Sequence, residues 1–127
     1  KELPLEGFRK MIEEAVRQFP NFEAIATTLR GVKTASINDW GAICWHKGVL
    51  HEAIHRPDMA IFDRVGGGDS FASGLVYGFM TTGDAEQAVN YGAAHGALAM
   101  TTPGDTTRAR LSEVENLMKG GSARVKR

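Results

Sequence analysis

The chain has 127 residues, in which 15 Lys and Arg side chains balance 15 Asp and Glu side chains, so its formal net charge is zero. Proteins that bind nucleic acid through its phosphates usually carry a basic patch or stripe, and neither the total charge nor any run of residues supplies one here. The composition therefore argues against nucleic acid as a partner.

Cys44 is the only cysteine, so no disulfide can form within the chain, and a reducing, cytoplasmic location is expected. The longest nearly apolar stretch, residues 92–100, is far shorter than the roughly 20 residues of a membrane span, which predicts a buried helix and no membrane partner. The chain starts at Lys1 without an initiator Met or a signal-peptide pattern, which suggests a piece of a longer protein.

The N-terminal residues show a helical pattern followed by a short apolar run. Apolar residues recur at three- and four-residue steps from Leu5 to Phe19, which predicts an amphipathic helix that ends at Pro20. Residues 24–29 show little polar alternation, a pattern expected of a strand buried on both faces of a parallel sheet. A helix followed by such a strand predicts an α/β fold.

Residues 34–54 have the pattern of a β-meander at the edge of a sheet, with a hairpin-like turn at 46–48. Residues 56–58 interrupt this pattern, and a brief strand is expected at 60–62.

Three helices are predicted in the second half of the chain, after a glycine-rich turn at 66–69. They are a helix from Ser70 to about Met80 closed by Gly83, a helix from Ala85 to about Met100 with a capping box of Asp84 and Gln87, and a short helix capped by Ser112 and Glu115 that stops at 120–121. A loop is expected at 101–107.

Two glycine pairs repeat a four-residue spacing inside these helices, Gly74 with Gly78 and Gly92 with Gly96. Each interior glycine costs a helix about 1 kcal/mol relative to alanine, so close approach of a neighbouring helix, strand or ligand is expected to compensate. Packing is the favoured interpretation, and nucleotide contact is the alternative.

Three further residues are assigned structural places: His95 as a hydrogen-bonded helix residue, and Trp40 and Trp45 as core or edge aromatics without a chemical role.

The turn Gly66-Gly67-Gly68 carries the first chemical signal. Its backbone N–H groups are not covered by side chains, and the helix behind it adds a partial positive charge, so the turn can hold an anion. It lacks the lysine of a Walker loop, and Phe71 stands at the third glycine position of the dinucleotide fingerprint. Both of those phosphate loops are excluded.

Asp69 follows the glycines and would repel a resting phosphate unless a substrate hydroxyl lies between the two. In phosphoryl transfer an aspartate accepts the hydroxyl proton while backbone donors stabilise charge on the phosphoryl oxygens. An aspartate beside a helix N-terminus is a weaker base, but a loose transition state needs little early proton transfer and depends more on placement. The local pattern alone also fits an alternative, in which Asp69 is an N-cap beside a tight turn.

Residues 63–74, DRVGGGDSFASG, resemble the C-terminal signature of the PfkB/ribokinase family of carbohydrate kinases, whose usual form is D-T-x-G-A-G-D-x-F-x-x-G. Arg64 replaces the usual Thr and Gly67 the usual Ala, and these departures resemble the 2-keto-3-deoxygluconate kinase branch. The segments 26–30, 38–40 and 103–105 look like further marks of that branch. The resemblance covers nearly the whole chain, from Phe19 to Arg127.

This resemblance implies a ribokinase-like α/β fold with a mostly parallel sheet flanked by helices. Residues 1–127 would form its C-terminal, nucleotide-binding and catalytic part, with the N-terminal sugar-binding and lid part absent. The implied activity is ATP-dependent phosphoryl transfer to the primary hydroxyl of a small sugar acid, with 2-keto-3-deoxygluconate as the expected substrate. The alternatives are a fructokinase- or ribokinase-type sugar kinase and an inactive nucleotide-binding fragment. The fragment alone is expected to be inactive, and the full-length protein is expected to be a homo-oligomer.

The resemblance also implies roles for single residues. The catalytic base carries over to Asp69 and the anion hole to Gly66, Gly67 and Gly68. ATP, bound as its Mg²⁺ complex, is expected to contact the strand end at Thr28 and Arg30 and the alanine-rich helix at Asn90, Ala93 and Ala97.

Three further positions carry alternatives. Asp63 and Val65 match a site at which many relatives hold a monovalent cation such as K⁺. Asp105 matches a substrate contact of the ketodeoxygluconate branch, and the alternative is a turn aspartate after Pro-Gly. Arg30 can pair with phosphate or with the carboxylate of a sugar acid, and the alternative is a solvated arginine at a strand end.

Overall fold

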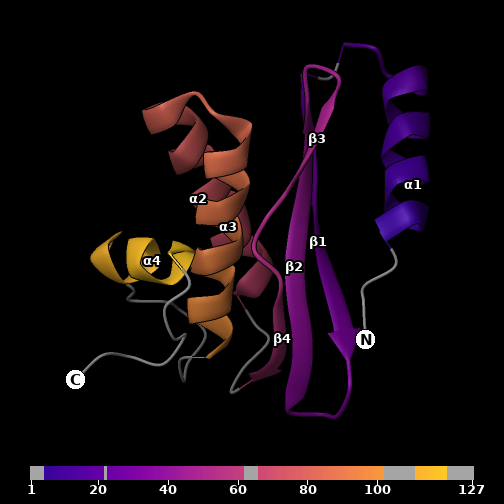
Figure 1. Ribbon diagram of the computed structural model, residues 1–127. Coiled ribbons are helices and arrows are strands. Elements are labelled where there is room, and N and C mark those ends of the chain that lie inside the picture. The colour runs from indigo at the N-terminus through magenta and orange to yellow at the C-terminus, as the bar shows by residue number, and fades with distance from the viewer. Residues whose placement is uncertain (1–4, 22, 62–65, 102–110, 120–127) are drawn as a thin grey trace.

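The computed structural model of the chain describes residues 5–21, 23–61, 66–101 and 111–119. The elements form layers, with α1 on one face of a four-stranded sheet and α2 and α3 on the other, where α4 packs against α3 (Figure 1). This arrangement confirms the predicted α/β class. In chain order the elements are α1 (Leu5–Gln18), β1 (Ala24–Val32), β2 (Ile37–His46), β3 (Val49–Glu52), β4 (Arg56–Ala60), α2 (Gly67–Thr82), α3 (Ala85–Met100) and α4 (Leu111–Met118).

Strand β2 is the centre of the sheet rather than its edge. It pairs with β1 along one side and with β3 and β4 along the other, and all three of these pairings are antiparallel. The predicted parallel pairing of 24–29 is therefore wrong for the described strands. The reason is the short connection between β1 and β2, because a parallel pair needs a crossover of a dozen or more residues. The predicted β-meander of 34–54 is present in β2 and β3, but its first strand lies inside the sheet rather than at its edge.

Strand β4 contains the residues that were expected to interrupt the sheet. It spans Arg56–Ala60, pairs with the first half of β2, and has a register shift opposite Asn38 and Trp40. Asp58 has a φ of 55°, which fits an irregular strand. Pro57 is accommodated because proline is tolerated on an edge strand.

The hairpin between β2 and β3 confirms the predicted turn. Lys47 and Gly48 both have positive φ, 52° and 81°, as a two-residue turn of type I′ requires. The hairpin brings Leu50 opposite Trp45 and His51 opposite Cys44.

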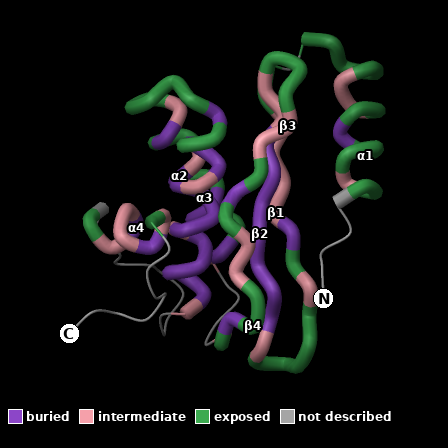
Figure 2. The backbone as a smooth tube through the Cα atoms, in the orientation of Figure 1, coloured by how far each residue is buried: buried purple, intermediate pink, exposed green. Residues whose placement is uncertain are grey.

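Alternation along β2 divides the core between the two faces of the sheet. Trp40, Ala42 and Cys44 pack on the side of α2 and α3, whereas Ile43 and Trp45 pack on the side of α1. Figure 2 shows that buried backbone runs along β2 and along most of α3. These two elements therefore form the buried centre of the molecule, and α3 contacts the glycine turn.

Helices α2 and α3 form an antiparallel pair whose ends differ in part from the predictions. Helix α2 begins at Gly67 rather than Ser70, and Gly83 closes it with a φ of 67° and an N–H bond to the Phe79 carbonyl, as predicted. Helix α4 begins at Leu111, so Ser112 lies inside it and is not its cap. Residues 120–121 and most of the predicted loop at 101–107 lie outside the described residues.

Asp84 caps α3, but without the predicted capping box. Its side chain accepts the Glu86 N–H at 2.9 Å. In a capping box the Gln87 side chain would accept a hydrogen bond from the Asp84 N–H. That N–H donates instead to Thr82 Oγ1 at 3.1 Å.

The glycine pairs serve close packing, as predicted. A Cβ placed on Gly78 would lie 2.5 Å from Ala88 Cα, and one placed on Gly74 would lie 2.6 Å from the Tyr91 carbonyl oxygen. On α3, a Cβ on Gly92 would lie 2.8 Å from atoms of Phe71.

No helix within the described ranges has the length and apolar character to cross a bilayer.

Candidate functional site

The N-terminus of α2 is built on a glycine in the left-handed region. Gly66 is the N-cap, with φ 87° and ψ −9°, and it provides no side chain to accept a hydrogen bond. The first bond within the helix runs from the Ser70 N–H to the Gly66 carbonyl at 2.9 Å. The N–H groups of Gly67, Gly68 and Asp69 precede that bond, so the helix itself gives them no acceptor.

Asp69 is the third residue of α2, so the alternative in which it is the N-cap is wrong. Its side chain is exposed in the first turn. Gly68 is exposed next to it, and no atom lies within 4 Å of a Cβ placed there. The structure thus combines an open set of N–H donors, the positive end of a 16-residue helix and a solvent-facing carboxylate.

Arg30 and Thr28 lie on the same face of the sheet as this turn. Paired residues of antiparallel strands share a face, and Arg30 is paired with Trp40 and Thr28 with Ala42. Trp40 and Ala42 both pack on the side of α2 and α3. Arg30 is exposed and Thr28 is half-buried, so the guanidinium of Arg30 is free to reach a ligand beside the sheet.

Ala93 and Ala97 are core residues with no exposed surface. The Ala93 carbonyl accepts a hydrogen bond from Trp40 Nε1 at 2.8 Å, and Ala97 packs in the same cluster as Trp40. Neither side chain reaches a surface on which a nucleotide could lie, and we leave both out of the proposed site.

Asn90 joins α3 to the segment after β3. Its Oδ1 accepts the Ile54 N–H at 2.9 Å, and its Nδ2 donates to the Glu86 carbonyl at 3.0 Å. It lines a hollow of about 590 Å³ together with Tyr91 and Glu115. At 1.5 Å per residue, Asn90 lies about 9 Å along α3 from Gly96, the α3 residue next to the Gly67 carbonyl, so it lies apart from the glycine turn.

The remaining predicted positions lie outside the described residues. These are Asp63 and Val65, for a monovalent cation, and Asp105, for the substrate. Among the residues that the structure does describe, no three His, Cys, Asp or Glu side chains form a group that could hold a metal ion.

His95 is a hydrogen-bonded helix residue, as predicted. It is half-buried on α3 and bonds with the backbone of Ser70, in the first full turn of α2. Burial lowers the pKa of His95 below its usual value, and the bond to Ser70 partly opposes this effect. The imidazole links α3 to the beginning of α2.

Two groups of polar contacts were not anticipated from the sequence. Lys33 pairs with Asp58 and lies 3.5 Å from the buried Asp39, whose Oδ1 accepts the Asp58 N–H at 2.9 Å. Tyr91 donates its hydroxyl to Glu115 at 2.7 Å. Lys33 and Asp58 are 25 residues apart and Tyr91 and Glu115 are 24 residues apart, so no local spacing could have revealed these two pairs.

A model of the pfkB family of carbohydrate kinases matches residues 11–111. The chain belongs to the pfkB carbohydrate kinase family. This membership confirms the resemblance that the glycine turn and Asp69 suggested.

Two relatives of this pfkB family chain carry more specific names. A 2-dehydro-3-deoxygalactonokinase of Haloferax volcanii is 33% identical over 88 residues, which are 68% of this chain and 27% of the relative. The crystal structure of a 2-dehydro-3-deoxygluconokinase of Thermotoga maritima superposes with a TM-score of 0.84 and 35% identity, over 91% of this chain and 35% of that one.

A pfkB family carbohydrate kinase of Listeria grayi has a TM-score of 0.80 at 23% identity, covering 85% of this chain and 34% of that one, and it supports the fold alone. The ribokinase-like fold is thereby confirmed. The chain spans about a third of the length of these proteins.

Proposed function

We propose that the full-length protein transfers the γ-phosphoryl group of ATP to the primary hydroxyl of a small sugar acid, with 2-keto-3-deoxygluconate as the substrate. The observation that carries this proposal is the N-terminus of α2. There, three N–H groups without helical acceptors point out of the helix beside the exposed carboxylate of Asp69.

In the proposed reaction, Asp69 accepts the proton of the attacking hydroxyl. The N–H groups of Gly67 and Gly68 donate to the phosphoryl oxygens, on which negative charge has to be stabilised. Mg²⁺, bound with the ATP phosphates, would neutralise part of their charge. The predicted K⁺ site at Asp63 and Val65 and the substrate contact of Asp105 stay predictions.

The sugar-acid substrate is supported by the relatives' names and by one charged residue. Both named relatives are kinases of 2-dehydro-3-deoxy sugar acids. Arg30 supplies an exposed guanidinium on the sheet face shared with the glycine turn, where it can pair with the carboxylate of such a substrate or with phosphate.

A substrate panel tests the proposal. The full-length protein is assayed for ATP-dependent phosphorylation of 2-keto-3-deoxygluconate, 2-keto-3-deoxygalactonate, fructose and ribose, with kcat/KM measured for each. We expect the two ketodeoxy acids to exceed the neutral sugars by at least about tenfold, which corresponds to about 1.4 kcal/mol. A preference for fructose or ribose would support the alternative sugar kinase. ATP binding without transfer to any of the four would support an inactive nucleotide-binding protein.

The role of Asp69 is tested with Asp69→Asn in the same protein. Loss of a general base should lower kcat by about 10²–10⁴-fold. Asp84→Asn is the matched control, because it also removes a helix-terminal carboxylate while asparagine still caps α3. We expect its kcat to stay within about twofold of the parent. Equal kcat values for the parent and Asp69→Asn would refute the proposed role.

The role of Arg30 is tested by measuring KM for 2-keto-3-deoxygluconate and KM for ATP in the variant Arg30→Ala. If the guanidinium binds the substrate carboxylate, KM for 2-keto-3-deoxygluconate rises by at least about tenfold and KM for ATP stays constant, since a hydrogen bond to a charged group contributes about 1.5–3 kcal/mol. If it binds phosphate, KM for ATP rises instead. Two unchanged values would identify a solvated arginine.

A further inference from the structure

The glycine turn packs against α3. Gly67 is buried, and a Cβ placed on it would lie 2.9 Å from Cγ and Sδ of Met100. One helical turn earlier on α3, a Cβ placed on Gly96 would lie 3.0 Å from the Gly67 carbonyl oxygen. A methyl group on Gly67 or on Gly96 would therefore have no space unless a neighbouring atom moved.

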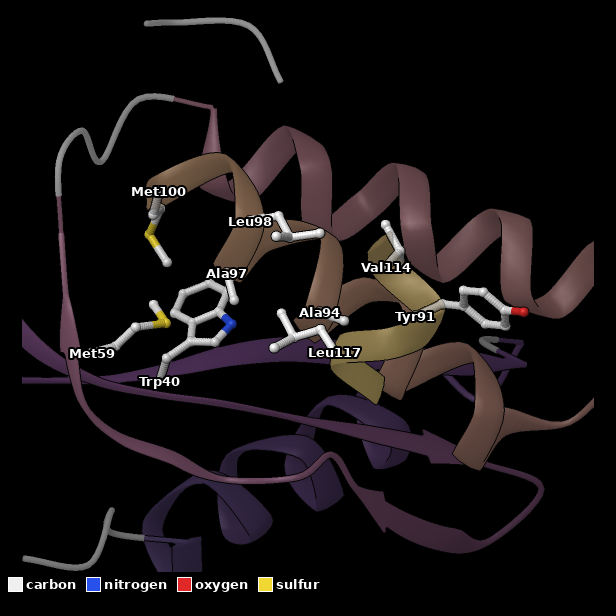
Figure 3. Packing of buried hydrophobic residues seen from close by; sticks show 9 residues of the cluster. All are labelled: Trp40, Met59, Tyr91, Ala94, Ala97, Leu98, Met100, Val114 and Leu117. Carbon is white, nitrogen blue, oxygen red and sulfur yellow. The ribbon is translucent and has the colours of Figure 1, made fainter. Parts of the chain in front are cut away.

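Trp40 occupies the other side of Gly96. A Cβ on Gly96 would lie 2.8 Å from Trp40 Cζ2, and the indole Nε1–H donates to the Ala93 carbonyl at 2.8 Å. The indole is 2% exposed, and Figure 3 shows its ring beside the side chains of Met59, Met100 and Ala97. The hydrogen bond and the close packing together leave the ring one orientation.

Trp40 also connects this contact to the central strand of the sheet. It lies on β2, which is paired along both sides. A continuous series of contacts thus runs from the central strand through Trp40 and Gly96 to the carbonyl of Gly67, next to the N–H groups that open α2.

We propose that Trp40, Gly96 and Met100 are positioning residues that set the location of the first turn of α2, and with it the anion hole and Asp69. This inference rests on the proposed phosphoryl transfer. Preorganised donors stabilise a transition state only when they are held at hydrogen-bond distance, and a displacement of about 1 Å can cost 10²-fold in rate. None of the three residues needs to touch the substrate in order to act in this way.

The first test is Gly96→Ala in the full-length enzyme, assayed with MgATP and 2-keto-3-deoxygluconate. The added methyl must displace Trp40 or the Gly67 carbonyl. We expect kcat per folded enzyme to fall by about 10–10²-fold, with KM for the sugar acid within about threefold. Gly78→Ala is the matched control, since its methyl meets Ala88 at 2.5 Å at the far end of α2. It should lower the melting temperature at least as much and leave kcat per folded enzyme within about twofold.

A rescue experiment separates positioning from general damage. Trp40→Phe removes Cζ2, the atom nearest to the new methyl. The kcat of the double variant Gly96→Ala/Trp40→Phe should therefore be at least about threefold higher than that of Gly96→Ala. Such non-additivity is expected only for residues in contact. A Gly96→Ala enzyme that melts earlier but keeps the parent kcat would overturn the inference, as would strictly additive effects.

A spectroscopic test needs no turnover. The full-length protein is labelled with 5-fluorotryptophan, and the resonances of Trp40 and Trp45 are assigned with Trp40→Phe and Trp45→Phe. Trp45 packs on the opposite face of the sheet, toward α1, and serves as the internal control. A non-hydrolysable ATP analogue should move the Trp40 resonance and leave that of Trp45 in place. A Trp40 resonance unmoved at saturating analogue would contradict the inference.

The two proposals fail in different ways. Loss of activity in Asp69→Asn with full activity in Gly96→Ala would reject the positioning residues and retain the phosphoryl transfer. Absence of any ATP-dependent phosphorylation by the parent enzyme, with a Trp40 resonance that still responds to the ATP analogue, would reject the transfer and retain the coupling between Trp40 and the anion hole.

Discussion

At the scale of single residues, Gly66 decides what the N-terminus of α2 can bind. Ser, Thr, Asp or Asn at an N-cap accepts a hydrogen bond from the first helical N–H groups and so occupies them. Asp84 does this for α3, where its side chain accepts the Glu86 N–H. Gly66 has no side chain, and its φ of 87° is readily available only to glycine. The contrast between the two helix starts explains why α2, unlike α3, has no capping side chain on its first N–H groups.

Tyr91 and Glu115 provide a residue-scale prediction about stability. The hydrogen bond to Glu115, together with burial, raises the pKa of Tyr91 from 10.0 to about 12. A group whose pKa is raised on folding contributes stability below its unfolded pKa, and this contribution is lost as the pH rises through the folded value. We therefore expect Tyr91→Phe to lower the free energy of unfolding by about 1 kcal/mol at pH 8. The difference should shrink between pH 10 and 12.

Urea unfolding of the full-length parent and variant at several pH values measures this difference. Tyr77→Phe is the control, because the ring of Tyr77 packs edge-on against Tyr91 at 5.1 Å while the bond to Glu115 is kept. A difference between Tyr91→Phe and the parent that stays constant up to pH 12 would show that the hydroxyl does not titrate as the geometry requires.

At the scale of elements, we expect a glycine-to-alanine substitution to have opposite effects on stability at two glycines with open surroundings. Gly7 lies in α1 and Gly48 in the hairpin turn with φ 81°, and a Cβ placed on either would meet no atom within 4 Å. Gly7→Ala should raise the free energy of unfolding by about 0.5–1 kcal/mol, because alanine loses less backbone entropy in a helix. Gly48→Ala should lower it by about 1 kcal/mol or more, because alanine is strained at positive φ. Thermal melts of the two variants check the signs, and a shift in the same direction would contradict the assigned conformations.

The elements differ in how far the sequence could predict them. Helix α1 and the turn at Lys47 and Gly48 follow from local signals, namely an amphipathic period ended by Pro20 and a Lys-Gly pair between two strands. The position of β2 at the centre of the sheet does not follow, because strand order depends on contacts between distant residues. The start of α2 was misplaced by three residues, because consecutive glycines weaken the helical signal although they lie inside the helix.

At the scale of the whole molecule, the layered architecture explains how the candidate site is assembled. The face of the sheet toward α2 and α3 carries Arg30 and Trp40 side by side, and α3 supports the glycine turn at Gly96 and Met100. The sequence predicted Asp69 and the glycines, because their chemistry is local. It also predicted a buried helix at 92–100, but it could not show that Ala93 and Ala97 lie away from any ligand, since a helix that is apolar all round does not reveal which side faces a ligand.

The chain spans about a third of the length of its relatives, so the central claim has to be tested in the full-length protein. The most direct measurement combines calorimetry of MgATP binding with rapid-quench single turnover, applied to the parent and to Asp69→Asn. If Asp69 activates the hydroxyl while the open N–H groups hold the phosphate, ATP affinity should stay within about threefold, and the transfer rate should fall by about 10²–10⁴-fold. A transfer rate equal to that of the parent, with 2-keto-3-deoxygluconate bound and ATP saturating, would contradict the account.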